Sequence, residues 1–315
     1  MAPHRPFRFT VQASHLHATE DLLPFARRAE DLGVSVLTVA DHLDEQVAPI
    51  AALMAVADAT TTLRIGSLVL ATDYRHPAVV AQELATIDRL SGGRLEVGIG
   101  AGWKATDYAA ANIAMDRPSI RIARLEEAVQ VIRGLWSDGP LNFEGDHYTI
   151  TEMNGAPKPL QRPCPPVVIG GGGRKVLSVA GRHADIVHLN PSLPAGVIDE
   201  RAGATATAAS TDQKIAWVRA AAGDRFDSLT FAVRVHLAVV TADDAARREI
   251  IELLAGGFGL TPEEAELTPH ALCGTVDQIC EALEYRRDRF GISDIGISAS
   301  VMDDLAPVIT RMSGT

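Results

Sequence analysis

The stretch from Pro165 to Arg182, Pro-Pro-Val-Val-Ile-Gly-Gly-Gly-Gly-Arg-Lys-Val-Leu-Ser-Val-Ala-Gly-Arg, joins a short apolar run to a helix-like segment through four glycines, Gly170 to Gly173. The pattern predicts a buried strand that turns directly into a helix. Bare backbone N–H groups at the positive end of a helix suit an anion such as a phosphate. The alternative is a tight turn that needs only a positive φ, but one turn requires fewer than four glycines.

The same alternation of β-rich runs and helical segments continues along the chain and gives eight pairs. Strands are expected over 7–11, 34–40, 63–70, 95–99, 167–169, 186–189, 230–235 and 295–298. Helices are expected over 20–32, 48–60, 78–90, 119–136, 174–182, 211–222, 243–255, 275–290 and 302–312. Eight βα units predict an α/β fold, the closed (β/α)8 TIM barrel. An open doubly wound sheet is the alternative, but its dinucleotide motif follows the first strand, whereas the glycine motifs here follow the fourth and fifth.

Composition fits one large core and few polyanionic partners. The 315 residues include 47% hydrophobic but only 5% aromatic side chains, as expected of buried parallel strands covered by helices, so we expect a single domain over 1–315. The net charge of −11 argues against binding to nucleic acid or to anionic membranes.

The cysteines and the amino terminus favour a soluble protein of the reducing cytoplasm. Three cysteines without a Cys-x-x-Cys pair predict neither a disulfide framework nor a thiolate zinc site. The first residues lack the apolar core of a signal peptide, and no apolar run approaches the length of about 20 residues that spans a bilayer.

Two segments depart from the βα repeat. Residues 137–166 hold two short β runs around Glu144-Gly-Asp146 and a proline-rich return, which predicts a β-hairpin insertion after the fourth βα unit. Residues 190–212 are rich in Ala, Thr, Gly and Ser and predict a mobile loop after the sixth strand. Such a loop could be a lid or simply disordered.

Asp41 and His42 follow the second strand, at the end where barrel enzymes place catalytic groups. An imidazole exchanges protons near neutral pH, and an adjacent carboxylate can orient it. His42 is therefore the first candidate for acid–base work, with Asp41 as its partner. A polar pair that caps a loop at the rim is the alternative.

A second glycine motif, Val97-Gly-Ile-Gly-Ala-Gly-Trp103, ends the fourth strand, where its glycines would let the backbone approach a planar ligand and Trp103 would wall it. Alone it is a weak signal that also fits a strand terminus with a core tryptophan. Arg75, in the loop after the third strand, could pair with a ligand carboxylate or phosphate. No metal site is predicted, because the histidines are scattered and no His-Glu-x-x-His occurs.

Several motifs in order resemble the luciferase-like monooxygenase superfamily, and in particular its F420-dependent oxidoreductase branch. They are Ala40-Asp-His42, Leu70-Ala-Thr-Asp-Tyr-Arg-His-Pro77, Asp88-Arg-Leu-Ser-Gly-Gly-Arg-Leu-Glu-Val-Gly-Ile-Gly-Ala-Gly-Trp103, Arg121-Ile-Ala-Arg-Leu-Glu-Glu-Ala128 and Pro166-Val-Val-Ile-Gly-Gly-Gly-Gly173. Each motif is weak alone, but together they are specific and cover nearly the whole chain.

The resemblance implies a barrel with a hairpin insertion, a homodimer, and a cofactor at the carboxyl ends of the strands, either FMN or coenzyme F420. The Asp-His pair is similar to the deazaflavin branch, so F420 is favoured. The family's non-prolyl cis peptide would fall at Ser67-Leu68. The implied cofactor-binding residues are Ser67, Leu68, Gly100, Ala101, Gly102 and Trp103 around the ring, and Gly170, Gly171, Gly172, Gly173 and Arg174 at the phosphate.

The implied reaction is hydride transfer between the deazaflavin ring and a small organic substrate, with His42 moving the accompanying proton. The family's sugar-phosphate dehydrogenases carry an acidic residue where this chain has Ala101, so their substrate is in doubt here. Two alternatives share the scaffold. They are an FMN-dependent two-component monooxygenase and a flavin- or deazaflavin-binding protein without catalysis.

Overall fold

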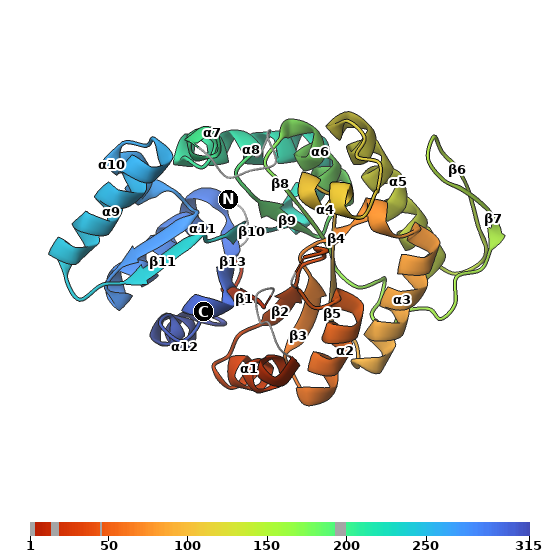
Figure 1. The fold of residues 1–315 in the computed structure, drawn as a ribbon, viewed down its shortest axis with the longest axis horizontal. Helices are drawn as coiled ribbons and strands as arrows, with labels where there is room; N and C mark the ends of the chain where they lie inside the picture. The colour runs from red at the N-terminus through yellow and green to blue at the C-terminus, as the bar shows by residue number, and fades with distance from the viewer. Residues whose placement is uncertain (1–3, 14–18, 45, 193–199) are drawn as a thin grey trace.

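A closed barrel of eight parallel strands forms the centre of the molecule (Figure 1). The computed structural model describes residues 4–13, 19–44, 46–192 and 200–315. The barrel strands are β1 (Arg8–Gln12), β2 (Val36–Val39), β3 (Arg64–Ser67), β5 (Leu95–Gly100), β8 (Val167–Gly171), β9 (Ile186–Leu189), β10 (Thr230–Arg234) and β13 (Ile292–Ser298). They pair in this order, and β13 returns to β1. The predicted TIM barrel is confirmed, with a strand in each of the eight expected places.

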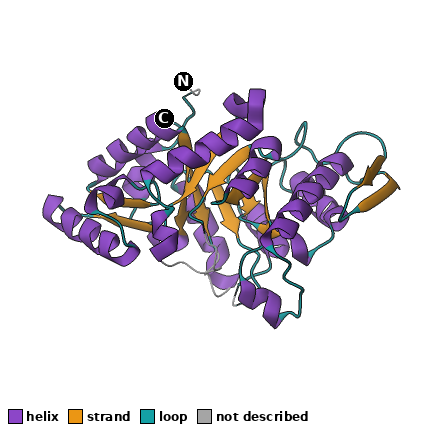
Figure 2. Cartoon of the chain, turned by 90° about the horizontal axis from the view of Figure 1, so that it is seen from above, coloured by secondary structure: helices purple, strands orange, loops and turns teal. Residues whose placement is uncertain are grey.

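Helices surround the barrel, as the view from above shows (Figure 2). The helices that cover the strands are α1 (Thr19–Asp31), α2 (Pro49–Ala59), α3 (Pro77–Leu90), α5 (Pro118–Trp136), α6 (Arg174–His183), α8 (Ala208–Ala222), α11 (Val276–Phe290) and α12 (Ala306–Met312). Shorter elements are α4 (Ala105–Ala110), α7 (Glu200–Ala204), α10 (Pro262–Leu267) and the 3₁₀ turns Thr72–Tyr74, Gly223–Ser228 and Ala299–Val301. No helix within the described ranges has the length and apolar character to cross a membrane.

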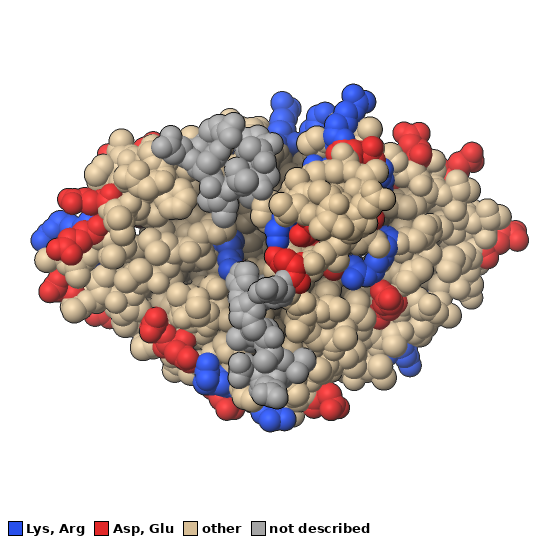
Figure 3. Space-filling view, viewed as in Figure 1, with Lys and Arg blue, Asp and Glu red and all other residues tan. Residues whose placement is uncertain are grey.

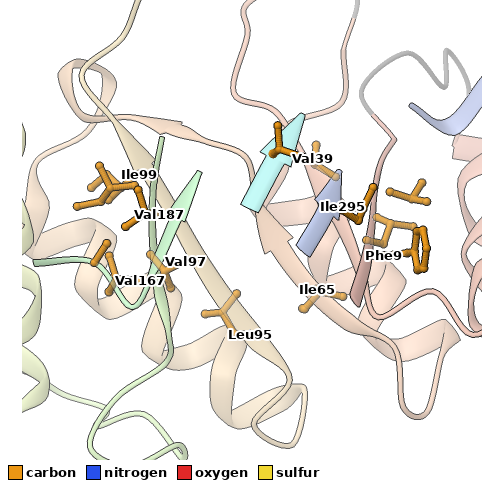
Figure 4. Close-up of a cluster of buried hydrophobic side chains, with 14 of the residues drawn as sticks. Phe9, Val39, Ile65, Leu95, Val97, Ile99, Val167, Val187 and Ile295 are labelled. Atoms are coloured by element: carbon orange, nitrogen blue, oxygen red, sulfur yellow. The ribbon is translucent and has the colours of Figure 1, made fainter. Parts of the chain in front are cut away.

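The strands form where the sequence is apolar because both of their faces are buried. Side chains such as Val97, Val187 and Ile295 point outward and pack in one core with the helices (Figure 4). In β2, β5 and β9 every residue is buried. This explains the near-continuous Val, Leu and Ile runs that identified the strands.

The barrel interior is more polar than the composition indicated. Glu96 accepts hydrogen bonds from Arg8 and Arg64 at 2.6 Å each. The Thr10 hydroxyl donates to Asp294 at 2.7 Å, and burial raises the pKa of that carboxyl. Above this layer lies a cavity of about 20 Å³. Because this charged layer fills the lower part of the barrel, the groups that a ligand could reach lie at the other end.

The predicted insertion is confirmed as a hairpin that projects from the barrel (Figures 1 and 2). Its strands β6 (Leu141–Glu144) and β7 (Thr149–Met153) pair antiparallel. The carboxylate of Glu127 on α5 accepts the backbone N–H groups of residues 146–148 at 2.9 to 3.1 Å, which ties the hairpin turn to the barrel.

The loop predicted over 190–212 is wrong for much of its length. Residues 193–199 lie outside the described residues, but α7 and the start of α8 cover 200–204 and 208–212. Alanine favours helices, and the Thr207 side chain caps α8 by accepting from the Ser210 N–H. A second parallel sheet, β11 (Leu237–Val240) with β12 (Ala271–Gly274), was not predicted. It packs against α9 (Asp244–Phe258) beside the barrel.

Glu30, at the end of α1, holds the turn that leads into β3. Its carboxylate accepts the backbone N–H groups of Thr61, Thr62 and Leu63 at 2.9, 2.5 and 2.8 Å. Burial acts to raise its pKa, but these hydrogen bonds outweigh burial and lower the pKa from 4.5 to about 2.

We therefore expect Glu30→Gln to lower the free energy of unfolding at pH 7 by about 1–2 kcal/mol, the size of hydrogen bonds to a charged acceptor. Because the folded pKa lies below the unfolded value, this stabilisation is present above pH 4.5 and is lost as the pH falls toward 2. Urea unfolding at several pH values measures it. Glu252→Gln, at an exposed position on α9, is the control, and an equal loss in both variants would contradict the assignment.

Candidate functional site

His42 lies just beyond β2 and is held by a carboxylate from a distant part of the chain. Its Nδ1 lies 2.7 Å from Oδ2 of Asp107, on the short helix α4. The Asp107 side chain is 3% exposed and that of His42 is 19% exposed. The ring of Trp103 stands edge-on to the imidazole, with the centroids 5.6 Å apart. The arrangement fixes the imidazole yet leaves part of it open to solvent.

Asp107 is a candidate site residue that the sequence did not reveal. It is 65 positions from His42 and belongs to no motif, so only the fold brings the two together. Lys104 adds a positive charge, since its ammonium lies 3.5 Å from Asp107 Oδ1 and also pairs with Asp44. The imidazole, the carboxylate and the ammonium form one polar group at the rim.

Asp41 does not orient His42, and this expectation is wrong. Its buried carboxylate accepts two hydrogen bonds from Arg75, at 2.6 and 3.1 Å, and a third from the Ala71 N–H at 3.1 Å. Arg75 is therefore engaged within the protein and does not stand free for a ligand anion. The pair clamps the segment after β3 onto the end of β2.

That segment crosses the barrel mouth as a bulge between β3 and β4 (Leu70–Ala71). The non-prolyl cis bond lies between Leu68 and Val69, one position beyond the expected Ser67-Leu68 bond. Ser67 is buried and its hydroxyl donates to the Gly98 carbonyl at 2.7 Å. Leu68 packs on Val168, Ile186 and Ala232, side chains that line the interior cavity. The bulge thus forms a floor across part of the mouth.

The glycines at and just after the end of β5 allow the bulge and α4 to pack closely against the backbone. A Cβ added at Gly98 would overlap the Ser67 carbonyl oxygen, and one at Gly100 would lie 2.6 Å from a methyl group of Val69. Gly102 has φ of 71°, and a Cβ there would overlap the Tyr108 hydroxyl. Packing within the protein explains these glycines, whereas the sequence analysis assigned them to ligand approach.

Two neighbours of these glycines were also expected at the cofactor ring. The Ala101 carbonyl accepts a hydrogen bond from Arg121 at 2.9 Å. Trp103 is 41% exposed, and its indole offers an aromatic surface beside His42.

Gly170, Gly171 and Gly172 lie close to neighbouring protein atoms, whereas Gly173 does not. None of the four has a positive φ, so a left-handed turn does not explain them. Gly170 and Gly172 run against Asn190 and Pro191 at the end of β9, whereas nothing lies within 4 Å of a Cβ added at Gly173. Gly173 begins α6 without a side-chain cap. The exposed side chains of Arg174 and Lys175 follow, and neither pairs with an acid within the described chain.

These groups share one arc of the rim, because β2, β3, β5 and β8 are consecutive in the barrel. The face of the molecule seen in Figure 3 is hollowed near its centre, and both acidic and basic atoms are visible in the hollow. An imidazole and an indole lie toward one end of the arc, and an open helix amino terminus with two cations lies at the other. The arc suits a planar ligand with an anionic tail. Among the residues that the structure describes, no cluster of His, Cys, Asp or Glu is arranged to hold a metal ion.

Comparisons with known proteins identify the family to which this fold belongs. Residues 4–272 match the family described as luciferase-like monooxygenase. An F420-dependent glucose-6-phosphate dehydrogenase of Amycolatopsis mediterranei is 37% identical over 173 residues, which are 52% of this chain and 51% of the relative. A 5,10-methylenetetrahydromethanopterin reductase of Archaeoglobus fulgidus is 28% identical over 92% of this chain and 81% of its own.

An FMNH(2)-dependent dimethylsulfone monooxygenase of Pseudomonas putida is 33% identical over 50% of this chain and 42% of its own. Thus the chain spans about half the length of the first curated relatives it matches. Among solved structures, the coenzyme F420 dependent tetrahydromethanopterin reductase of Methanopyrus kandleri superposes with a TM-score of 0.77, at 15% identity over 98% of both chains. That likeness shows the shared barrel fold.

The buried Asp41–Arg75 pair yields a stability prediction. We expect Asp41→Asn to lower the free energy of unfolding by about 3 kcal/mol, because it leaves the guanidinium without its countercharge in a mostly buried place. Chemical denaturation measures the change. The control Asp277→Asn removes the partner of Arg311 at the surface and should cost less than about 1 kcal/mol. Equal, small losses would show that the pair is not a structural clamp.

Proposed function

The chain belongs to the luciferase-like monooxygenase family, and we propose that it is a coenzyme F420-dependent oxidoreductase acting on a small organic substrate. The observation that carries the proposal is the His42–Asp107 pair beside the exposed indole of Trp103. It supplies a proton-transfer group at the barrel end where this family binds its cofactor. The F420-dependent relatives from Amycolatopsis and Archaeoglobus favour the deazaflavin over other cofactors.

The residues present fit such a cofactor. The open position at Gly173, the uncapped start of α6 and the side chain of Arg174 would hold its phosphate. Leu68 and Trp103 would contact the ring system, while Ser67 supports the bulge from beneath through its bond to Gly98. When bound, the deazaflavin supplies the hydride chemistry.

His42 moves the proton that accompanies hydride transfer. A carboxylate oxygen of Asp107 accepts the hydrogen bond, with Nδ1 of His42 as its donor. Nε2 is then the ring atom that gives or takes the proton at the substrate oxygen or nitrogen. Asp107 is a positioning residue, because it acts by fixing the tautomer and the orientation of the imidazole.

An FMN-dependent monooxygenase is the second candidate, because the Pseudomonas putida relative uses reduced FMN. A glycine-lined helix terminus suits the phosphate of either cofactor, so this feature does not separate the two. A carrier without catalysis would need neither His42 nor Asp107. The homodimer, the cytoplasmic location and the single domain over 1–315 stay predictions from the sequence.

Cofactor preference tests the proposal directly. We expect the apoprotein to bind F420 with a Kd at least about tenfold lower than that for FMN, a difference of about 1.4 kcal/mol. Fluorescence titration with each cofactor measures both constants. Tight binding of FMN without binding of F420 would reject the F420 assignment and favour the monooxygenase.

His42→Ala tests the proton-transfer role. We expect kcat to fall about 10²- to 10⁴-fold, because general acid–base groups contribute rate enhancements of this size. The Kd for F420 should change little. Turnover is followed by F420 absorbance in whichever reaction of a panel of alcohols and activated alkenes the wild type supports. Asp107→Asn should give a smaller loss, because the amide keeps the contact without the charge. Asp212→Asn, which breaks a surface pair with Arg289, is the control. Full turnover in His42→Ala would remove the histidine from the mechanism.

A further inference from the structure

A group of basic side chains lies across the barrel mouth from His42, on strands β9 and β10 and the segments beside them. On one side of the ring of strands, β1 and β13 separate β10 from β2, and on the other side β3, β5 and β8 separate β9 from β2. The group, named here the rim basic cluster, consists of His188, Lys214, Arg234, His236 and His270. None of the five forms an ion pair with an acidic residue of the described chain.

Strand alternation turns the cluster toward the mouth. Phe231 and Val233 of β10 pack outward in the core, whereas Ala232 between them lines the interior cavity. Arg234 and His236 continue the inward series of Ala232 toward the carboxyl end of the strand. His188 lines the same cavity from β9.

Gly296 of β13 lies close to the backbone of β10 and to the His188 imidazole. A Cβ added there would lie 3.1 Å from the Val233 carbonyl oxygen, 3.4 Å from Nε2 of His188 and 3.7 Å from the Cα of Arg234. The missing side chain therefore lets β13 pass close to the histidine and the arginine.

The Lys214 ammonium donates to the carbonyls of Asn190 and Thr205 at 2.8 and 2.5 Å, but several buried imidazole nitrogens of the cluster have no partner in the described chain. Both ring nitrogens of His188, a residue 4% exposed, lack a hydrogen-bond partner, and the nearby Asn190 side chain makes no bond of normal geometry to them. His270, which is 5% exposed, contacts the Arg234 carbonyl through Nδ1 at 2.9 Å, but its Nε2 is also unpartnered. The Arg234 guanidinium donates to the Ile297 carbonyl at 3.2 Å. Buried polar groups without partners are costly, so their persistence here points to a ligand.

The charges of the cluster indicate that such a ligand is negatively charged. Burial lowers the pKa of Arg234 to about 10 and that of Lys214 to about 8, values at which both still carry positive charge at pH 7. Burial and the charge of Arg234 lower the pKa of the buried His188 to about 3, and burial holds the pKa of His270 well below its usual value. The cluster thus concentrates uncompensated positive charge beside neutral imidazoles that can donate hydrogen bonds. A negatively charged ligand would balance the positive charge and would accept hydrogen bonds from the imidazoles.

We propose that the rim basic cluster is a subsite for an anionic oxygen group of the substrate, a carboxylate or a phosphate, held by the guanidinium fork of Arg234 and by His188 and His236. This inference rests on the proposed function, because it places the reacting part of the same molecule toward His42 across the mouth. The anionic tail of the cofactor is the other source of the same chemistry. We assign that tail to Gly170–Gly173 and Arg174, where the neighbouring strand β8 ends and α6 begins.

Inorganic phosphate is the probe that tests the subsite. In protein saturated with F420, where the cofactor's own phosphate site is occupied, phosphate should bind saturably in a calorimetric titration. Arg234→Gln should raise the phosphate Kd about tenfold or more, as expected for loss of a charge-assisted hydrogen bond, with the F420 Kd unchanged within about twofold. His236→Gln is a substitution at an exposed position that folding should tolerate, and it should also raise the phosphate Kd. Arg311→Gln, at a surface pair far from the mouth, is the control.

The outcomes separate the two hypotheses. An unchanged phosphate Kd in both mouth variants, or no saturable binding to the wild type, overturns the subsite. A weakened F420 Kd in Arg234→Gln also overturns it, because the cluster would then bind the cofactor's tail. If the wild type binds no F420 at all, the proposed function fails. In that case the phosphate titration of the unloaded protein tests the subsite by itself, since Arg234→Gln must still raise one phosphate Kd about tenfold or more.

Discussion

The close contact between the bulge after β3 and the glycine-bearing end of β5 is the constraint on which the site depends. Only a residue without a side chain at Gly98 lets the Ser67 carbonyl come so near, and Gly100 makes the same allowance for Val69. The bulge can then lie across the mouth, with Leu68 on the interior side chains. The Asp41–Arg75 pair secures it to the segment that follows β2, where His42 also lies. One packing requirement therefore positions both the floor of the site and the segment that leads to its imidazole.

Two aspartates near the same histidine have different tasks. Asp41 is its neighbour in sequence but faces the bulge, whereas Asp107 arrives from α4 and contacts the ring. The helix α4 is anchored in turn by Tyr108, whose hydroxyl donates to Asp73 at 2.8 Å and occupies the space that Gly102 leaves. The Gly-x-Gly-x-Gly motif thus contributes to the chemistry indirectly, by letting the bulge and α4 approach.

The barrel, its eight strands and the projecting hairpin could be predicted because their signals are local. Apolar runs mark strands that are buried on both faces, and the Glu144-Gly-Asp146 turn marks the hairpin. The His42–Asp107 and Asp41–Arg75 pairs could not be predicted, since the residues are 65 and 34 positions apart and depend on how strands and loops assemble. The β11–β12 sheet was missed because its short strands lie outside the regular βα repeat. The helices α7 and α8 were missed in part because small residues such as Ala and Thr occur in loops as well.

The proposed cofactor position, along the arc from His42 to Gly173, is measured most directly by a crystal structure of the protein with bound F420. We expect the ring against Leu68 and Trp103, with Nε2 of His42 facing its reactive side and the phosphate on the N–H groups at the start of α6. A phosphate bound elsewhere on the rim, or an imidazole turned away from the ring, would contradict it.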